Sequence, residues 1–148
     1  MKGRALDGGC LCGAVRYHLR GDPYDTGWCH CRICQHLSGS GGMAFTTVAF
    51  DQFVIEHGAG RLGRHASTPF GERCFCIDCG SPLTIHVSHQ ANEIDIAVGS
   101  LDDPALVAPG FHLFAKQARP WMLPDDGLPR YDGLRPETRG LRQGQTEL

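Results

Sequence analysis

Cysteine thiols dominate the chemistry that this sequence can offer, because its eight cysteines fall into three short blocks. The blocks span residues 10–12, 29–34 and 74–79, and one or two residues separate neighbouring cysteines within each block. A thiolate is a soft ligand that suits Zn²⁺, which it binds at about 2.3 Å in a tetrahedral arrangement. The grouping therefore predicts metal binding.

The first and third blocks can together complete one tetrahedron. Cys76 and Cys79 form a Cys-x-x-Cys turn, and the following Gly80 can adopt the positive φ that closes such a turn. Cys10 and Cys12 can supply the other two ligands. Because a site with four cysteines leaves no position for substrate, we expect a structural zinc here.

The second block carries three sulfurs within six residues, at Cys29, Cys31 and Cys34. Three protein ligands leave the fourth corner of a zinc tetrahedron for water or substrate, which is the arrangement of catalytic zinc sites. A metal held in this way can stabilise a thiolate or polarise a carbonyl. We therefore expect two zinc ions per chain, and iron held by thiolates is the main alternative.

The remaining cysteine, Cys74, leaves a second interpretation open. If Cys74 is the fourth ligand of the second metal, both metals are structural, and the chain is a non-enzymatic zinc-binding scaffold or interaction module. Disulfides are disfavoured because residues 1–7 lack the apolar stretch of a secretion signal, which predicts a reducing compartment. Unliganded structural cysteines are disfavoured by the clustering itself.

The rest of the sequence predicts a mainly β fold that positions these blocks. Apolar residues alternate with a period of two, as in half-buried strands, and no helix of normal length fits between the glycines and prolines. Short helical turns are expected at residues 32–37 and at Pro104, with Asp102 or Asp103 as its N-cap. The expected strands lie within residues 14–20, 43–50, 53–55, 83–87, 94–98 and 111–115.

Length and charge narrow the class of protein further. A chain of 148 residues has the size of one domain, so we assign residues 1–148 to a single domain with a flexible tail at about 138–148. The formal net charge of −2 offers little attraction to nucleic acid or anionic lipid, and no stretch approaches the length of a membrane span. We expect a cytoplasmic protein whose partner is a small molecule.

Three ordered motifs surround the cysteines. They are Gly-x-Cys-x-Cys-Gly at residues 8–13, Cys-His-Cys-x-x-Cys with a later Ser-Gly at residues 29–39, and Arg-x-Phe-Cys-x-x-Cys-Gly-Ser-x-Leu at residues 73–83. Residues 99–104 and the series Pro109, His112, Phe114 and Pro120-Trp121 follow. From about residue 8 to residue 131 the chain thus resembles the family of glutathione-dependent formaldehyde-activating enzyme (Gfa) and centromere protein V. Each motif is weak alone, whereas the ordered set is specific.

The resemblance implies a compact β-tent of several small antiparallel sheets stapled by zinc. The family's activity joins glutathione and formaldehyde to S-hydroxymethylglutathione, and in reverse it is a carbon–sulfur lyase. Glutathione, or another small thiol, is then the implied partner. Cys74 departs from the family pattern, which requires no thiol at this position. By this resemblance, the family's structural zinc maps to Cys10, Cys12, Cys76 and Cys79. Its second, catalytic-type zinc maps to Cys29, Cys31 and Cys34.

Several further residues carry narrower expectations. His30 lies between two expected ligands and should face away from the metal. We expect His112 to be partly buried and Trp121 to dock onto the core. Four cations could bind the carboxylates of a glutathione-like substrate, although scattered cations are more often solvated; they are Arg16, Arg64, Arg73 and Lys116.

Overall fold

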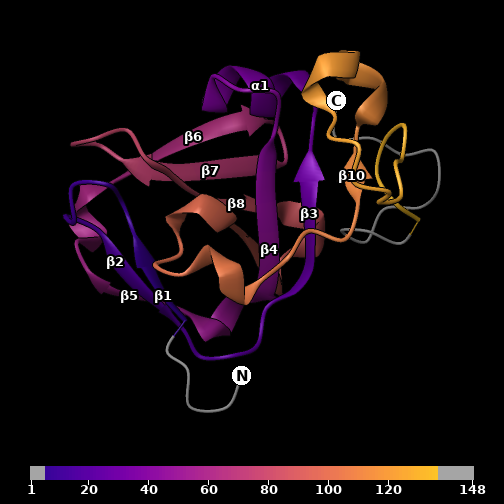
Figure 1. Ribbon diagram of the computed structural model, residues 1–148. Helices are drawn as coiled ribbons and strands as arrows, with labels where there is room; N and C mark the ends of the chain where they lie inside the picture. The colour runs from indigo at the N-terminus through magenta and orange to yellow at the C-terminus, as the bar shows by residue number, and fades with distance from the viewer. Residues whose placement is uncertain (1–5, 137–148) are drawn as a thin grey trace.

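The computed structural model describes residues 6–136, which form two β-sheets (Figure 1). The smaller sheet is antiparallel, with strand order β1-β2-β5, and consists of Leu6–Gly9, Arg16–Leu19 and Phe53–His57. The larger sheet has the order β10-β3-β4-β9-β8-β7-β6, and all its neighbouring strands are antiparallel except β10 and β3. Its strands are β3 (Tyr24–Cys29), β4 (Met43–Ala49), β6 (Leu62–Thr68), β7 (Gly71–Cys76), β8 (Pro82–Val87), β9 (Glu93–Ala97) and β10 (His112–Leu113).

One α-helix, α1 at Arg32–Ser38, occurs within residues 6–136, above β4 in the view of Figure 1. It ends at Gly39, whose φ of 66° is left-handed and therefore favours glycine. The other helical segments are single turns between strands. They are η1 (Phe50–Gln52), η2 (Ala59–Arg61), η3 (Ser88–Gln90), η4 (Val98–Ser100), η5 (Pro104–Leu106), η6 (Ala115–Gln117) and η7 (Pro120–Met122).

The expected mainly β class is confirmed, and each of the six alternating runs contains a strand. The expected helical turns are present as α1 and η5, and Asp103 caps η5 by accepting a hydrogen bond from the Ala105 N–H at 3.1 Å. Strands β1, β3, β6 and β7 were not among the expected runs. The side chains of β6 are mostly polar, because β6 is an edge strand that buries little of its surface.

Two apolar clusters form the core, and each contains cysteines. One lies between the small sheet and the large one and includes Val15, Tyr17, Val48, Ile96 and Cys76. The other surrounds the cysteines of residues 29–34, and its apolar members include Met43, Phe45, Phe111, Leu113 and Phe114. The packing of the two sheets therefore places each cysteine group in or beside a hydrophobic cluster.

The segment after β10 differs from expectation at one residue. Trp121 in η7 is 79% exposed, so the expectation that it docks onto the core is wrong. Tyr131 and Leu134 instead pack against the second cluster. The expected tail at 138–148 lies outside the described residues. None of the helical segments in the described part of the chain has the length and apolarity needed to span a bilayer.

Candidate metal centres

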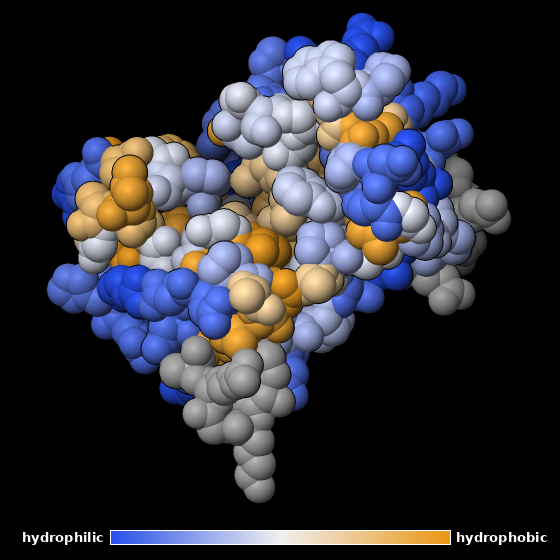
Figure 2. Space-filling view, in the orientation of Figure 1, coloured by the Kyte–Doolittle hydropathy of each residue, from blue (hydrophilic) through white to orange (hydrophobic). Residues whose placement is uncertain are grey.

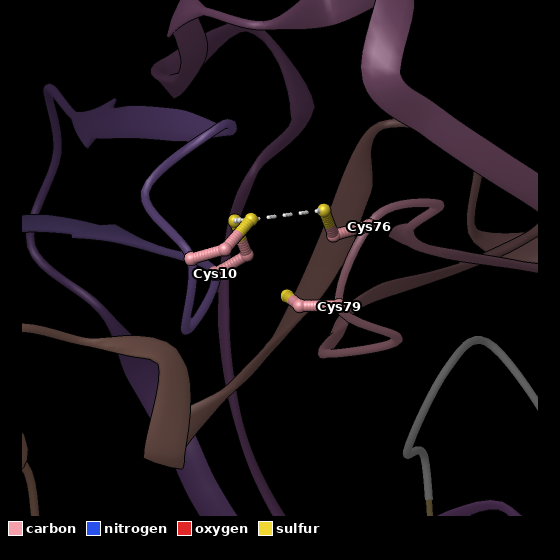
Figure 3. A group of neighbouring side chains, drawn as sticks. Cys10, Cys76 and Cys79 are labelled. Carbon is pink, nitrogen blue, oxygen red and sulfur yellow. Dashed lines mark hydrogen bonds between the residues drawn. The ribbon is translucent and has the colours of Figure 1, made fainter.

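Four sulfurs from two distant parts of the chain meet between the small and the large sheet. The Sγ atoms of Cys10, Cys12, Cys76 and Cys79, the outer group, all lie within 4.8 Å of one another. The Cys10–Cys12 and Cys12–Cys76 sulfur distances are 3.6 and 3.8 Å. Figure 3 shows the side chains of Cys76 and Cys79 pointing toward Cys10 from the opposite turn. Sulfurs at about 2.3 Å from one Zn²⁺ in a tetrahedron are about 3.8 Å apart, so the outer group fits tetrahedral zinc.

Backbone hydrogen bonds hold both turns of the outer group. The Gly13 N–H donates to the Cys10 carbonyl at 3.2 Å, and the Gly80 N–H donates to the Cys76 carbonyl at 2.8 Å. Both glycines have left-handed φ values, 81° and 78°, which residues with a Cβ rarely adopt. The Val15 N–H donates to the Cys10 sulfur at 3.3 Å. These hydrogen bonds hold the two turns in the conformation in which their sulfurs converge.

Ser81, which sequence analysis did not single out, connects the two turns. Its hydroxyl accepts a hydrogen bond from the Leu11 N–H at 2.9 Å and lies 3.2 Å from the Cys79 sulfur. Hydrogen bonds from Ser81 lower the pKa of the Cys79 thiol to about 6. A thiolate at this position is the form that binds a metal. The Gly-Ser pair after the Cys-x-x-Cys turn was the sequence signal for this residue.

Three further sulfurs meet where β3 runs into α1. The Sγ atoms of Cys29, Cys31 and Cys34, the middle group, lie within 4.8 Å of one another, and all three residues are buried. Cys29 ends β3, and Cys31 is the N-cap of α1, where its sulfur accepts a hydrogen bond from the Cys34 N–H at 3.3 Å. Within residues 6–136, no fourth cysteine, histidine or carboxylate belongs to this group.

Hydrogen bonds favour negative charge on Cys31, one sulfur of the middle group, whereas the pKa values of the neighbouring Cys29 and Cys34 thiols are raised. Hydrogen bonds from the Cys29 and Cys34 thiols lower the pKa of Cys31, and the Cys34 N–H and the charge of Arg73 act in the same direction. Arg73, on β7, places Nη2 3.4 Å from the Cys34 sulfur. Three thiolates around a divalent cation carry a net charge of about −1, which a neighbouring guanidinium offsets. The donor set therefore fits a thiolate-bound metal such as zinc.

Cys74 does not join the middle group in this structure. Its sulfur is absent from the set that lies within 4.8 Å, and its hydrogen-bond partner is the Arg64 Nη1 at 3.7 Å on the neighbouring strand β6. Successive side chains of a strand alternate in direction, so the register that brings Arg73 to Cys34 does not bring Cys74 there.

His30 faces away from the middle group and takes part in a buried polar chain that sequence analysis missed. Its Nδ1 lies 2.8 Å from the Gly41 carbonyl, and its Nε2 lies 2.9 Å from Nδ1 of His112. Nε2 of His112 lies 2.9 Å from the Asp126 carboxylate. His112 is fully buried rather than partly buried. The Gly41 carbonyl and the Asp126 carboxylate can only accept hydrogen bonds, so the three hydrogen bonds of this chain need three N–H protons on the two imidazole rings. Two neutral rings carry only two such protons, so one ring is positively charged, and the Asp126 carboxylate balances that charge.

The hydrogen bonds of His30 shape the loop between α1 and β4. A Cβ at Gly42 would lie 2.8 Å from both the Cys29 carbonyl oxygen and His30 Nδ1, so this position requires glycine. Burial lowers the pKa of His30, which favours the neutral ring. The His30–His112–Asp126 chain thus fixes the backbone on which Cys29 and Cys31 stand.

A cavity of about 390 Å³ is lined by Arg73, the residue that contacts the Cys34 sulfur; none of the three cysteines of the middle group lines it. Its wall includes Leu37, Met43, Phe45, Arg64 and Arg73. Met43, Pro82 and Ala97 also line a larger groove of about 800 Å³ that extends to Arg16 and Asp102. Figure 2 shows the surface hollowed next to α1, with apolar surface exposed in the middle of this face.

A third set of possible ligands, Asp7, His18 and Glu56, brings its atoms within 4.8 Å on the small sheet. Asp7 Oδ1 and His18 Nδ1 already form a hydrogen bond with one another at 2.7 Å, and Glu56 is exposed. Exposed groups of this kind commonly occur without a metal, and we assign none here.

Comparisons with known proteins agree with the motifs. The family model described as glutathione-dependent formaldehyde-activating enzyme matches residues 5–117. A Halomonas elongata protein named "Putative glutathione-dependent formaldehyde-activating enzyme" is 35% identical over 86 residues, which is 54% of this chain and 55% of that protein. An "Uncharacterized lyase" of Schizosaccharomyces pombe is 34% identical over 86 residues, 58% of this chain and 61% of that protein. These matches therefore span little more than half of either curated relative.

A solved structure extends the likeness to the fold. The crystal structure of a Rhodobacter sphaeroides protein has a TM-score of 0.58 with this chain at 20% sequence identity. The superposition covers 85% of this chain and 100% of that one. At this identity the likeness concerns the fold alone.

Proposed function

Because this chain belongs to the family of glutathione-dependent formaldehyde-activating enzymes, we propose that it is a zinc-dependent carbon–sulfur lyase or synthase of that type. Its substrate is a thiol–aldehyde adduct such as S-hydroxymethylglutathione. In the lyase direction the carbon–sulfur bond breaks, the hydroxyl proton leaves as the carbonyl forms, and the sulfur takes up a proton, which gives a thiol and formaldehyde. The synthase direction reverses each of these changes.

The two cysteine groups take different roles in this proposal. The outer group holds a structural zinc that links the turn at Cys10 and Cys12 to the turn at Cys76 and Cys79. Cys29, Cys31 and Cys34 hold a second zinc. When bound there, the metal supplies Lewis-acid stabilisation of a thiolate or a developing alkoxide. Arg73 donates a hydrogen bond to the Cys34 sulfur, and the apolar cluster around Phe45 and Phe111 excludes bulk water.

One observation carries the proposal: three buried cysteines converge, and no fourth ligand residue among residues 6–136 completes their set. A closed tetrahedron would favour the scaffold interpretation, and Cys74, its expected fourth ligand, pairs with Arg64 instead. The cavity supports the proposal, because Arg73 both lines it and contacts the Cys34 sulfur, and a substrate needs such a space near the metal ligands.

The location and domain organisation are also proposals. All eight cysteines are free thiols in the structure, which fits the reducing cytoplasm. Residues 6–136 are joined by two sheets and two core clusters, which supports a single domain. A small thiol, rather than nucleic acid or a membrane, is the partner that a cavity of this size fits.

Exchange spectroscopy by NMR tests the activity. Glutathione and ¹³C-formaldehyde equilibrate with their adduct without any enzyme, so the readout is the exchange rate at equilibrium. The zinc-loaded protein should accelerate exchange, and Cys31→Ser should abolish the acceleration. Cys74→Ser is the matched control and should retain it. An unchanged exchange rate with the zinc-loaded wild type would instead support a non-enzymatic metal-binding scaffold.

A further inference from the structure

The cavity of about 390 Å³ contains a cation whose ion pairing is incomplete. Four cations were candidates for binding carboxylates, and the structure separates them. Arg16 is paired with Asp102, and Arg64 is paired with Glu72 at 2.9 Å. Lys116 is exposed in η6, and it does not line the cavity. Arg73 lines the cavity and, among the described residues, has no carboxylate partner.

The contacts of Arg73 are unusual for a half-buried guanidinium. Its Nε donates to the Ser67 hydroxyl at 3.1 Å, and its Nη2 donates to the Cys34 sulfur at 3.4 Å. Its Nη1 lies 4.0 Å from the Met43 sulfur, and the guanidinium carbon lies 5.9 Å from the centre of the Phe45 ring. These contacts orient the guanidinium firmly, yet none of them supplies the oxygen anion that an arginine fork matches best.

A count of donors shows what Arg73 can still bind. A guanidinium carries five N–H donors. Ser67, Cys34 and the weak contact with Met43 use three of them. One N–H on each terminal nitrogen is left, and two such donors are what a single carboxylate accepts. The oriented guanidinium is therefore a preformed carboxylate site that also contacts a sulfur of the middle group.

The space around Arg73 matches a substrate of peptide size. The cavity of about 390 Å³ is mainly apolar in its side chains, which include Leu37 and the Phe45 ring that lies near the guanidinium. Met43, Pro82 and Ala97 line both this cavity and the groove of about 800 Å³. Cavities of this size bury small ligands, and a few polar groups in them fix the orientation.

We propose that Arg73 binds a carboxylate of the thiol substrate in this cavity and so selects thiols that carry a carboxylate. The inference rests on the proposed function, because it assumes that the substrate sulfur reaches the middle group. Arg73 then donates hydrogen bonds both to the Cys34 sulfur and to the substrate carboxylate. Its fixed position would set the distance between the carboxylate and the reacting sulfur.

Binding of a non-reacting probe tests this proposal separately from turnover. S-methylglutathione has no free thiol and cannot form the formaldehyde adduct, and its dimethyl ester lacks both carboxylates. Titration of the zinc-loaded protein by calorimetry should show that the acid binds about 10- to 100-fold more tightly than the ester, as expected for charge-assisted hydrogen bonds. Arg73→Gln should remove most of this preference while zinc content is unchanged.

Arg64→Gln is the matched control, because Arg64 lines the same cavity but already pairs with Glu72. It should keep the preference for the acid. If Arg73 only supports Cys34, Arg73→Gln will weaken both probes equally, and the proposal fails. Equal affinity of the wild type for the two probes, or binding of neither, would also overturn it without any variant having to fold. A protein that binds the acid selectively through Arg73 but does not accelerate adduct exchange would refute the proposed function, and only the carboxylate site at Arg73 would remain established.

Discussion

Replacing Cys76 by serine opens the outer group and tests whether it holds a structural metal. The change removes one sulfur of a four-sulfur set at a fully buried position. Cys12 and Cys76 lie 64 positions apart in the sequence. A cross-link that closes a loop of this length stabilises a fold by about 4 kcal/mol through the entropy of the unfolded chain. The free energy of unfolding of a typical domain is only about 5–15 kcal/mol, so we expect Cys76→Ser to destabilise the fold severely.

The magnitude can be converted into a melting temperature. For a domain of this size, a loss of about 1 kcal/mol in the free energy of unfolding lowers the Tm by about 2–4 °C. Cys76→Ser should therefore lower the Tm by at least about 8 °C and remove one zinc per chain. Calorimetry of the soluble fraction and elemental analysis provide the two readouts, and accumulation of the variant in the insoluble fraction is the extreme form of the same result.

Cys74→Ser is a closely matched control for Cys76→Ser. It makes the same atomic change two residues earlier on β7, outside both cysteine groups, and should keep the wild-type Tm and zinc content. A Cys76→Ser protein with two zinc ions and an unchanged Tm would refute the reasoning.

Three further predictions concern other parts of the molecule. Cys31→Ser should lose about one equivalent of zinc and all adduct exchange but keep the wild-type circular dichroism spectrum; loss of the whole fold would contradict the division of roles. His112→Phe removes the partner of the buried His30 Nε2, so the free energy of unfolding in urea should fall by about 1–3 kcal/mol, and an unchanged value would show that the polar chain adds nothing. Burial raises the pKa of Tyr17 to about 12. Above pH 10 the unfolded chain therefore binds fewer protons than the folded one, and the free energy of unfolding should fall as pH rises from 10 to 12. Tyr17→Phe should reduce that fall in urea titrations, and a pH profile identical to the wild type would contradict this role of Tyr17.

The sequence could predict the two cysteine groups because local turns determine most of their geometry. The spacing of Cys76, Cys79 and Gly80 specifies a turn that the structure reproduces, including the left-handed glycine. The overlap of Cys29, Cys31 and Cys34 with the start of a short helix follows in the same way. Strands with apolar alternation were also predictable, because one face of each is buried in a core cluster.

What could not be predicted depends on contacts between distant segments. No local pattern indicates that Arg73, rather than Arg16 or Arg64, has no carboxylate partner within residues 6–136, since Asp102 and Glu72 reach the other two only in the folded sheet. The pairing of His30 with His112 spans 82 positions and is likewise invisible to periodicity. Trp121 was expected to dock onto the core because the segment around it is apolar, yet it lies on an exposed single turn.

The central claim is that the outer group encloses one metal completely while the middle group leaves one corner of another open. Anomalous diffraction at the zinc edge from crystals of the full chain tests it most directly. The account predicts two peaks, one surrounded by Cys10, Cys12, Cys76 and Cys79, and the other bound by Cys29, Cys31 and Cys34 with a fourth ligand from outside the protein. A disulfide within either group, or a protein atom such as the Cys74 sulfur in the fourth position, would contradict it.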